Sequence, residues 1–142
     1  MRAIAILAAV AAVLALSGTA DASDRSVLTT GKSSYGRVLF DGRGFALYAF
    51  THDTKGKSTC AGACAKAWPP YLVKNAAKAG AGTRARLLGT TRRSDGSLQV
   101  TYKGQPLYYY VGDRSAGQIL CQNVTEFGGV WLVVRPDGGL VR

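Results

Sequence analysis

The residues of this chain best suited to chemistry are its three cysteines and its single histidine. Cys60 and Cys64 stand four positions apart, Cys121 lies far along the chain, and the histidine is His52. Thiols in an oxidising compartment usually pair. Three single bridges are possible, namely 60–64, 60–121 and 64–121. On one helical turn, Cys60 and Cys64 would place their Cα atoms about 6 Å apart, which a disulfide spans. The four residues could instead form a Cys₃His set for zinc or a thiolate-rich set for Cu(I).

Carboxylates are the next candidates for chemistry, and they are few. A general acid and base could be drawn from Asp53, Asp113 and Glu126, but no spacing selects a pair. With a single histidine and no nucleophile-elbow motif, the sequence gives little support for a Ser-His-Asp triad. No glycine-rich phosphate loop follows a strand with the required spacing. We therefore predict no enzymatic activity, no catalytic residue and no cofactor.

The elements that must position these residues are predominantly strands. Residues 37–50 predict a β-hairpin around an Asp-Gly pair. Residues 60–68 predict about two turns of helix, ended by two prolines. Residues 86–111 predict a three-stranded meander, residues 112–129 a long loop, and residues 131–134 a final buried strand. We expect a mostly β fold with one or two short helices.

A seven-residue pattern occurs twice in the chain. Leu47 to Asp53 and Leu107 to Asp113 both read Leu-Tyr-x-aromatic-x-x-Asp at an offset of 60 residues. Further pairs match at the same or nearly the same offset: Gly44 and Gly104, Cys60 and Cys121, Trp68 and Trp131. A fixed period with this many matches indicates an internal duplication. We predict a single small domain formed by two copies of a β-rich repeat related by a pseudo-twofold axis.

The repeated motif is predicted to be structural. Alternation along a strand puts the first and second aromatic residues of each copy on one face. The aspartate follows where the strand should have ended, and it could accept a hydrogen bond from the N–H two residues along, as in an Asx-turn. The rival hypothesis is that Asp53 and Asp113 converge on a cation. Tyr109 falls on the opposite face and is our candidate for an exposed contact. The residues assigned to the structural motif are Tyr48, Phe50, Asp53, Tyr108, Tyr110 and Asp113.

These residues resemble the bacterial secreted-repeat family, described as predicted lipoproteins with a Tyr-x-(Phe/Trp/Tyr)-x-x-Asp motif. Both copies match that motif, and Ser58 to Pro70 matches the family segment Ser-x-Cys-x-Gly-x-Cys-Ala-x-x-Trp-Pro-Pro. The family segment carries its two cysteines without Cys121, so the resemblance implies a disulfide between Cys60 and Cys64. It implies an extracytoplasmic protein and no particular activity. The chain departs from the family in lacking a lipid-attachment cysteine and in carrying Cys121.

The N-terminus predicts export. A basic start is followed by an apolar run over residues 3–16, which is shorter than the roughly 18–20 residues that span a bilayer. Small residues at Ala20 and Ala22 then suit a signal peptidase. We predict no transmembrane segment after signal removal. The predicted divisions are a signal peptide (1–22), a flexible mature N-terminus (23–34), repeat 1 (35–73), a linker (74–85) and repeat 2 (86–142).

The charge of the chain indicates either a basic, solvated surface without a dedicated partner or an attraction to anionic partners. Lys and Arg number 18 against 8 Asp and Glu, for a net charge of +10, and no five basic residues are consecutive. Such charge favours attraction to anionic polymers, whereas a specific nucleic acid is not expected outside the cell. We predict a secreted, non-enzymatic cell-envelope or extracellular protein that acts by binding or structural association, with anionic cell-wall polymer as a candidate partner. The alternative is an extracytoplasmic redox or metal-handling protein that uses Cys60, Cys64 and Cys121.

Overall fold

The computed structural model describes residues 24–142, so the predicted signal peptide (1–22) lies outside the described residues. Strands dominate, as predicted, and no helix within residues 24–142 is long and apolar enough to cross a membrane. The elements are β1 (Val27–Ser33), β2 (Gly36–Asp41), β3 (Tyr48–Phe50), α2 (Ala63–Ala67), β4 (Leu72–Val73), β5 (Lys78–Ala79), the 3₁₀ turn η1 (Ala85–Leu87), β6 (Leu88–Arg92), β7 (Leu98–Tyr102), β8 (Gln105–Tyr108), β9 (Val124–Glu126) and β10 (Gly129–Val133).

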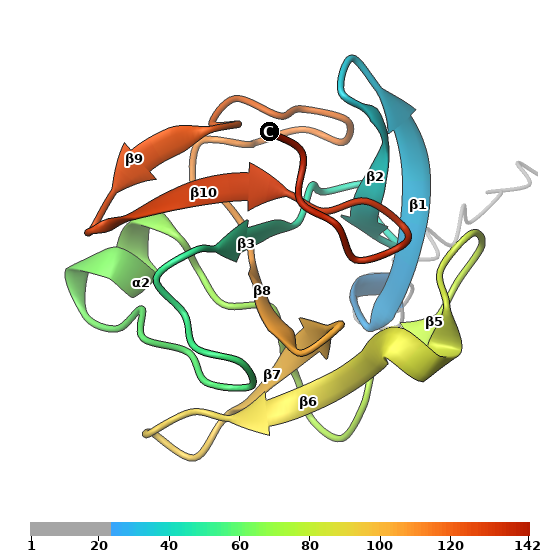
Figure 1. Ribbon diagram of the computed structural model, residues 1–142. Coiled ribbons are helices and arrows are strands. Elements are labelled where there is room, and N and C mark those ends of the chain that lie inside the picture. Colours follow the sequence, from blue (N-terminus) through green and yellow to red (C-terminus); the bar gives the residue numbers. More distant parts are fainter. Residues whose placement is uncertain (1–23) are drawn as a thin grey trace, which may run out of the picture.

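The strands form two sheets around a central pair. The smaller sheet has the order β2-β1-β5, and the larger has the order β4-β7-β8-β3-β10-β9 with β6 paired to β7. The strands β3 and β8, which carry the two motif copies, pair antiparallel in the middle of the larger sheet, with Tyr48 opposite Tyr108 (Figure 1). This register is the one that a twofold axis between the two copies requires.

The two copies exchange their last segments. Near the end of copy 1, β4 pairs with β7 of copy 2, and near the end of copy 2, β10 pairs with β3 of copy 1. Backbone bonds repeat the exchange: Val100 N donates to Tyr71 O over 2.8 Å, and Leu39 N donates to Val134 O over 2.9 Å. Neither copy therefore completes its own sheet, which explains why the duplicated chain folds as one domain.

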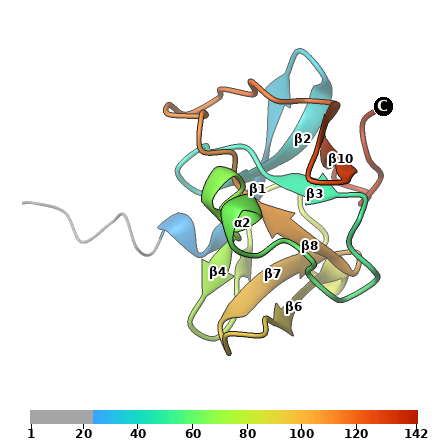
Figure 2. The same ribbon diagram turned by 90° about the vertical axis from the view of Figure 1, so that its left-hand side faces the viewer.

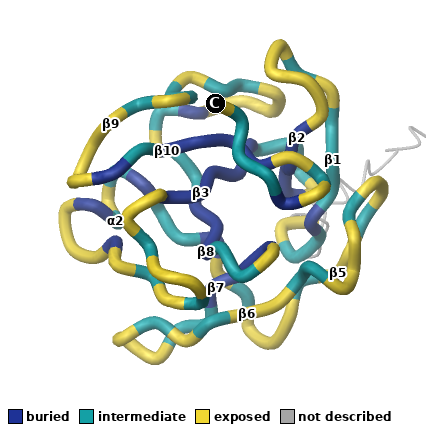
Figure 3. The backbone as a smooth tube through the Cα atoms, in the orientation of Figure 1, coloured by how far each residue is buried: buried dark blue, intermediate teal, exposed yellow. Residues whose placement is uncertain are grey.

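The hydrophobic core lies on both sides of the central strands. The fully buried residues concentrate on β2, β3, β7, β8 and β10, whereas the connecting loops at the rim are exposed (Figure 3). The helix α2 is shorter than the predicted 60–68 (Figure 2), and the carbonyl of its last residue, Ala67, accepts from the Val111 N–H over 3.0 Å. It stops before Pro69 and Pro70, and it is followed by Trp68, whose side chain is fully buried.

Three sequence-based boundaries need correction. Residues 23–34, predicted to be flexible, contain strand β1. The strand was missed because its sequence is polar and Leu28 is its one fully buried residue. Backbone pairing with β2 stabilises it. The predicted linker 74–85 contains β5, which pairs with β1. The predicted loop 112–129 contains β9, which pairs with β10.

Candidate functional site

The two motif copies are joined by a crossed pair of tyrosine–aspartate hydrogen bonds. The Tyr48 hydroxyl donates to Oδ2 of Asp113 over 2.7 Å, and the Tyr108 hydroxyl donates to Oδ2 of Asp53 over 2.7 Å. Both tyrosines are fully buried. Each bond therefore connects the tyrosine of one copy with the aspartate of the other, a pairing that the spacing within a single motif does not reveal.

The second oxygen of each aspartate holds the loop that follows its own strand. Asp53 Oδ1 accepts from the Thr59 N–H over 2.7 Å and from the Thr59 hydroxyl over 2.8 Å. Asp113 Oδ1 accepts from the Leu120 N–H over 2.9 Å. The expected partner was an amide two residues along, but the bonded amides lie six and seven residues along. Each carboxylate thus closes a wider loop than an Asx-turn does.

A matching pair of backbone bonds ties these loops to the opposite copy. Gly56 N donates to Gly104 O over 2.8 Å, and Gly117 N donates to Gly44 O over 2.8 Å. A Cβ at Gly44 or Gly104 would lie 2.9 or 3.2 Å from the opposing loop, and both glycines have positive φ, 90° and 74°. Close approach and backbone conformation together explain why glycine occupies this position in both copies.

Four aromatic rings stack in a column across the pseudo-twofold axis. The rings of Trp68 and Trp131 lie parallel with their centroids 4.0 Å apart. Phe50 stacks on the outer side of Trp131 at 4.1 Å, and Tyr110 packs on the outer side of Trp68 at 4.8 Å. The inner rings are the repeat-equivalent tryptophans and the outer rings are the second aromatic residues of the two motifs. Along the column the rings therefore alternate between the two copies, and each copy contributes two of them.

Glu126 fixes both tryptophans of this column. The Trp68 indole N–H donates to Glu126 Oε2 over 2.8 Å, and the Trp131 indole N–H donates to the Glu126 carbonyl over 3.1 Å. Each of the three carboxylates considered for acid–base chemistry thus accepts a hydrogen bond from an aromatic side chain.

Burial governs the ionisation of the motif residues. It raises the pKa of the Tyr48 hydroxyl far above its ordinary value, and the bond to Asp113 raises that pKa further. Burial likewise raises the pKa of Tyr108. Burial also raises the pKa of Asp113, although the bonds from Tyr48 and Leu120 oppose that shift. The tyrosines therefore remain protonated donors at neutral pH, whereas a general base requires a pKa near the working pH.

Cys60 and Cys64 form a disulfide with their Cα atoms 5.3 Å apart, which confirms the pairing that the resemblance implied. Both residues are buried, and the Arg93 guanidinium donates to the Cys60 carbonyl over 2.7 Å. The thiol of Cys121, the repeat-equivalent of Cys60, is free and half-buried, and it packs against the core that contains the aromatic column.

The alternative metal set of His52, Cys60, Cys64 and Cys121 is not assembled as a cluster. Two of its sulfur atoms are joined to each other, and His52 is exposed with its ring against Phe50. Within residues 24–142, no three or more His, Cys, Asp or Glu side chains are arranged to hold a metal ion.

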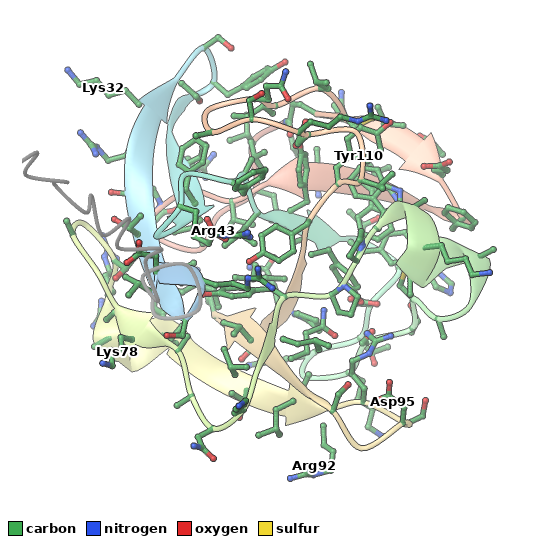
Figure 4. The ribbon with its side chains drawn as sticks, turned by 180° about the vertical axis from the view of Figure 1, so that it is seen from behind. Lys32, Arg43, Lys78, Arg92, Asp95 and Tyr110 are labelled. Carbon is green, nitrogen blue, oxygen red and sulfur yellow. A yellow bond between two sulfur atoms is a disulfide. The ribbon has the colours of Figure 1, made fainter. Side chains whose placement is uncertain are left out.

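A buried polar cluster around Asp41 escaped the sequence analysis. Asp41 belongs to the Asp-Gly pair of the predicted hairpin, but its side chain is fully buried and accepts from Arg43 Nη2 over 2.8 Å and from the Tyr109 hydroxyl over 2.9 Å. The expectation of an exposed Tyr109 is therefore wrong, because the ring is half-buried and its hydroxyl bonds inward. Arg43 lies toward the middle of the face seen in Figure 4.

Acidic and basic side chains are used differently in this fold. Six of the seven acidic residues in residues 24–142 accept hydrogen bonds through their carboxylates: Asp41, Asp53, Asp95, Asp113, Glu126 and Asp137. By contrast, basic side chains such as Lys32, Lys78 and Arg92 point outward at the rim of the molecule (Figure 4). The carboxylates largely serve internal bonding, while the excess of positive charge is displayed to solvent.

The chain matches the model of a known protein family. A family model described as a secreted repeat of unknown function matches residues 29–71 and 89–135. The two matched segments contain the two motif copies, and the first begins within β1 rather than at the predicted residue 35. No curated protein and no solved structure matches the chain.

Proposed function

The chain belongs to the family of secreted repeats of unknown function, and from this premise we propose that it is an exported, non-enzymatic protein that binds anionic polymers of the cell envelope. The family supplies the extracytoplasmic setting. The chemistry of the chain itself supplies the choice of ligand.

The observation that carries the proposal is the displayed positive charge. The whole chain has 18 Lys and Arg against 8 Asp and Glu. Residues 1–23 contain one of each kind, Arg2 and Asp21, so residues 24–142 keep the same excess of ten. A surface with this excess attracts polyanions over several ångströms and concentrates them near the protein.

The motif chemistry supports a binding role over a catalytic one. The aspartates are occupied by tyrosine hydroxyls and loop amides, and the tyrosines remain protonated. These groups hold two copies of a repeat together, and such a rigid scaffold suits the display of charged side chains on its loops.

Cosedimentation with purified cell walls tests the proposal. The protein should pellet with walls at low salt and be released as salt rises, because mobile ions screen exposed charges over about 10 Å at 0.1 M ionic strength. Walls stripped of their anionic polymers provide the control and should retain less protein. Failure to pellet with intact walls at low salt would refute the proposed function.

A further inference from the structure

We propose that the anionic polymer binds in one place, a basic groove lined by Lys55, Lys103, Gln105, Arg135, Leu140 and Arg142. The inference rests on the proposed function and specifies its binding site. Two adjoining hollows of about 780 and 300 Å³ share five of these residues, all but Arg135. The groove forms where the loop after β3, the β7–β8 turn and the chain after β10 meet.

Cations dominate the basic groove. Lys55, Lys103, Arg135 and Arg142 are all exposed, and neither lysine forms an ion pair within residues 24–142. Two acidic side chains are close to the groove. Oδ1 of Asp137 lies 3.5 Å from Nε of Arg135. Asp53 lines the smaller hollow, but its oxygens already accept from Tyr108 and Thr59. The two lysines are therefore the cations most available to a ligand.

Glycines shape the floor of the groove and guide the two lysines. A Cβ at Gly104 would lie 3.2 Å from Cγ of Lys55, and one at Gly138 would lie 2.6 Å from Cδ of Lys103. The aliphatic stems thus run across backbone that carries no side chain. Packing a stem in this way leaves the ammonium group in solvent and restricts the conformations that binding would otherwise have to freeze.

Lys103 occupies an unfavourable backbone position. It has φ of 51° and Gly104 has φ of 74° in the two-residue turn between β7 and β8. A two-residue turn with both φ values positive favours Asn-Gly or Gly-Gly, because a longer side chain is strained there. Residues held in such conformations cluster at functional sites. A lysine at this turn is explained by the positive charge that it brings to the groove.

The geometry selects the kind of ligand. The groove is open and carries several separate cations along its length, whereas a site for one small anion would be closed and would converge on it. A linear polymer with repeated anionic groups fits this arrangement, and the anionic groups can be phosphodiesters or uronic acid carboxylates. Such a strand can contact Lys55, Lys103 and Arg135 together, because all three line the larger hollow.

A charge-matched pair of variants tests the groove. The groove variant is Lys55→Ser with Lys103→Asn, and the control variant is Lys32→Ser with Lys78→Asn, which removes the same charge from exposed sites elsewhere. Linear polyphosphate and polygalacturonate are titrated separately by calorimetry, and vesicles of phosphatidylcholine with phosphatidylglycerol form a third arm. Lys103→Asn creates an Asn-Gly turn, so this substitution should raise the melting temperature and cannot be dismissed as misfolding.

We expect the groove variant to bind at least one of the two polymers about tenfold more weakly than the wild type, while the control variant changes less than about threefold. The dependence of log K on log salt should also become shallower by roughly 1.4 for two lost contacts, at about 0.7 each for a single strand. Equal losses in both variants would overturn the groove, as would binding to vesicles alone. A wild-type protein that binds neither polymer nor cell walls would overturn the proposed function itself, so the two failures are distinguishable.

Discussion

At the scale of a single residue, Tyr48→Phe measures the contribution of one hydrogen bond, because it removes the hydroxyl and keeps the buried ring. Tyr48→Phe leaves Oδ2 of Asp113 without its donor in a site that is 7% exposed, so the free energy of unfolding should fall by about 1–3 kcal/mol. Tyr71→Phe is the matched control, because the Tyr71 hydroxyl is buried without a hydrogen-bond partner among the described residues. That variant should be no less stable than the wild type. Urea unfolding measures both, and equal losses would contradict the role of the crossed bond.

Asp53 should tolerate an amide better than a methyl group. In Asp53→Asn, Oδ1 still accepts from Thr59, and the new amide can donate to the Tyr108 oxygen while that hydroxyl turns to Ser58, whose Oγ lies 2.6 Å away. In Asp53→Ala both partners are lost, and stability should fall by about 0.5–2 kcal/mol by analogy with helix caps. Thermal melts with calcium or chelator decide between the structural role of these hydrogen bonds and the cation hypothesis. Equal damage from both variants, together with a calcium-dependent rise in wild-type Tm, would support the cation.

At the scale of a single element, the disulfide between Cys60 and Cys64 restrains the start of helix α2. It joins residues four apart at the start of α2, and closing so short a loop stabilises a fold by about 2 kcal/mol in the chain-entropy model. Cys60→Ser with Cys64→Ser should therefore fold and melt earlier. Alkylation of the unfolded, unreduced wild type should label one thiol, that of Cys121, and mass spectrometry counts the labels. Three labelled thiols without reductant would show that the bridge does not form.

Sequence patterns predicted those elements whose hydrophobic signal is local. The aromatic motif strands and the short helix before Pro69 follow from residue types and spacing. The predicted hairpin over residues 37–50 is wrong as a pair of strands, because β2 pairs with β1 in the smaller sheet and meets the segment before β3 at one bridge, between Phe40 and Ala46. Strand β1 was missed because its stability comes from backbone pairing with β2, and its sequence Val-Leu-Thr-Thr-Gly-Lys-Ser buries little apolar surface. Strand β9 was missed for the same reason, since its three residues are half-buried or exposed.

The pairing of elements was harder to predict than their existence. Alternation along a strand shows which side chains share a face, but it does not show which strand lies next to it. The duplication predicted a pseudo-twofold axis, yet the exchange of β4 and β10 between copies depends on contacts far apart in the sequence. For the same reason the aspartates were assigned to local turns, and their tyrosine partners in the opposite copy were not predicted.

At the scale of the whole molecule, the fold brings together basic residues that are scattered along the sequence. Lys55, Lys103 and Arg135 are far apart along the chain, and no run of basic residues marks them. The repeat symmetry brings the Gly56 loop against the Gly104 turn, and the chain after β10 completes the groove. The Lys-Gly pair within the predicted meander over residues 86–111 was the one sequence feature that could have drawn attention to Lys103.

Alkaline unfolding tests the packing of the whole molecule. Burial raises the pKa values of Tyr48, Tyr71, Tyr108 and Tyr109 in the folded state, whereas the unfolded chain should ionise near the ordinary tyrosine value of about 10. The stabilisation from keeping these hydroxyls neutral is therefore complete below about pH 10 and is lost as pH rises further, at about 1.4 kcal/mol per pH unit for each tyrosine.

Tyrosinate absorbance and circular dichroism, followed together as pH is raised, check this expectation. The four tyrosines should ionise together with the loss of native dichroism, because the folded core holds them protonated until it opens. Tyr71→Phe should make the fall in stability shallower by about 1.4 kcal/mol per pH unit while leaving the crossed bonds intact. If the four hydroxyls ionise one by one while the native dichroism persists, then the core admits hydroxide without unfolding, and the crossed tyrosine–aspartate bonds do not hold the two copies together.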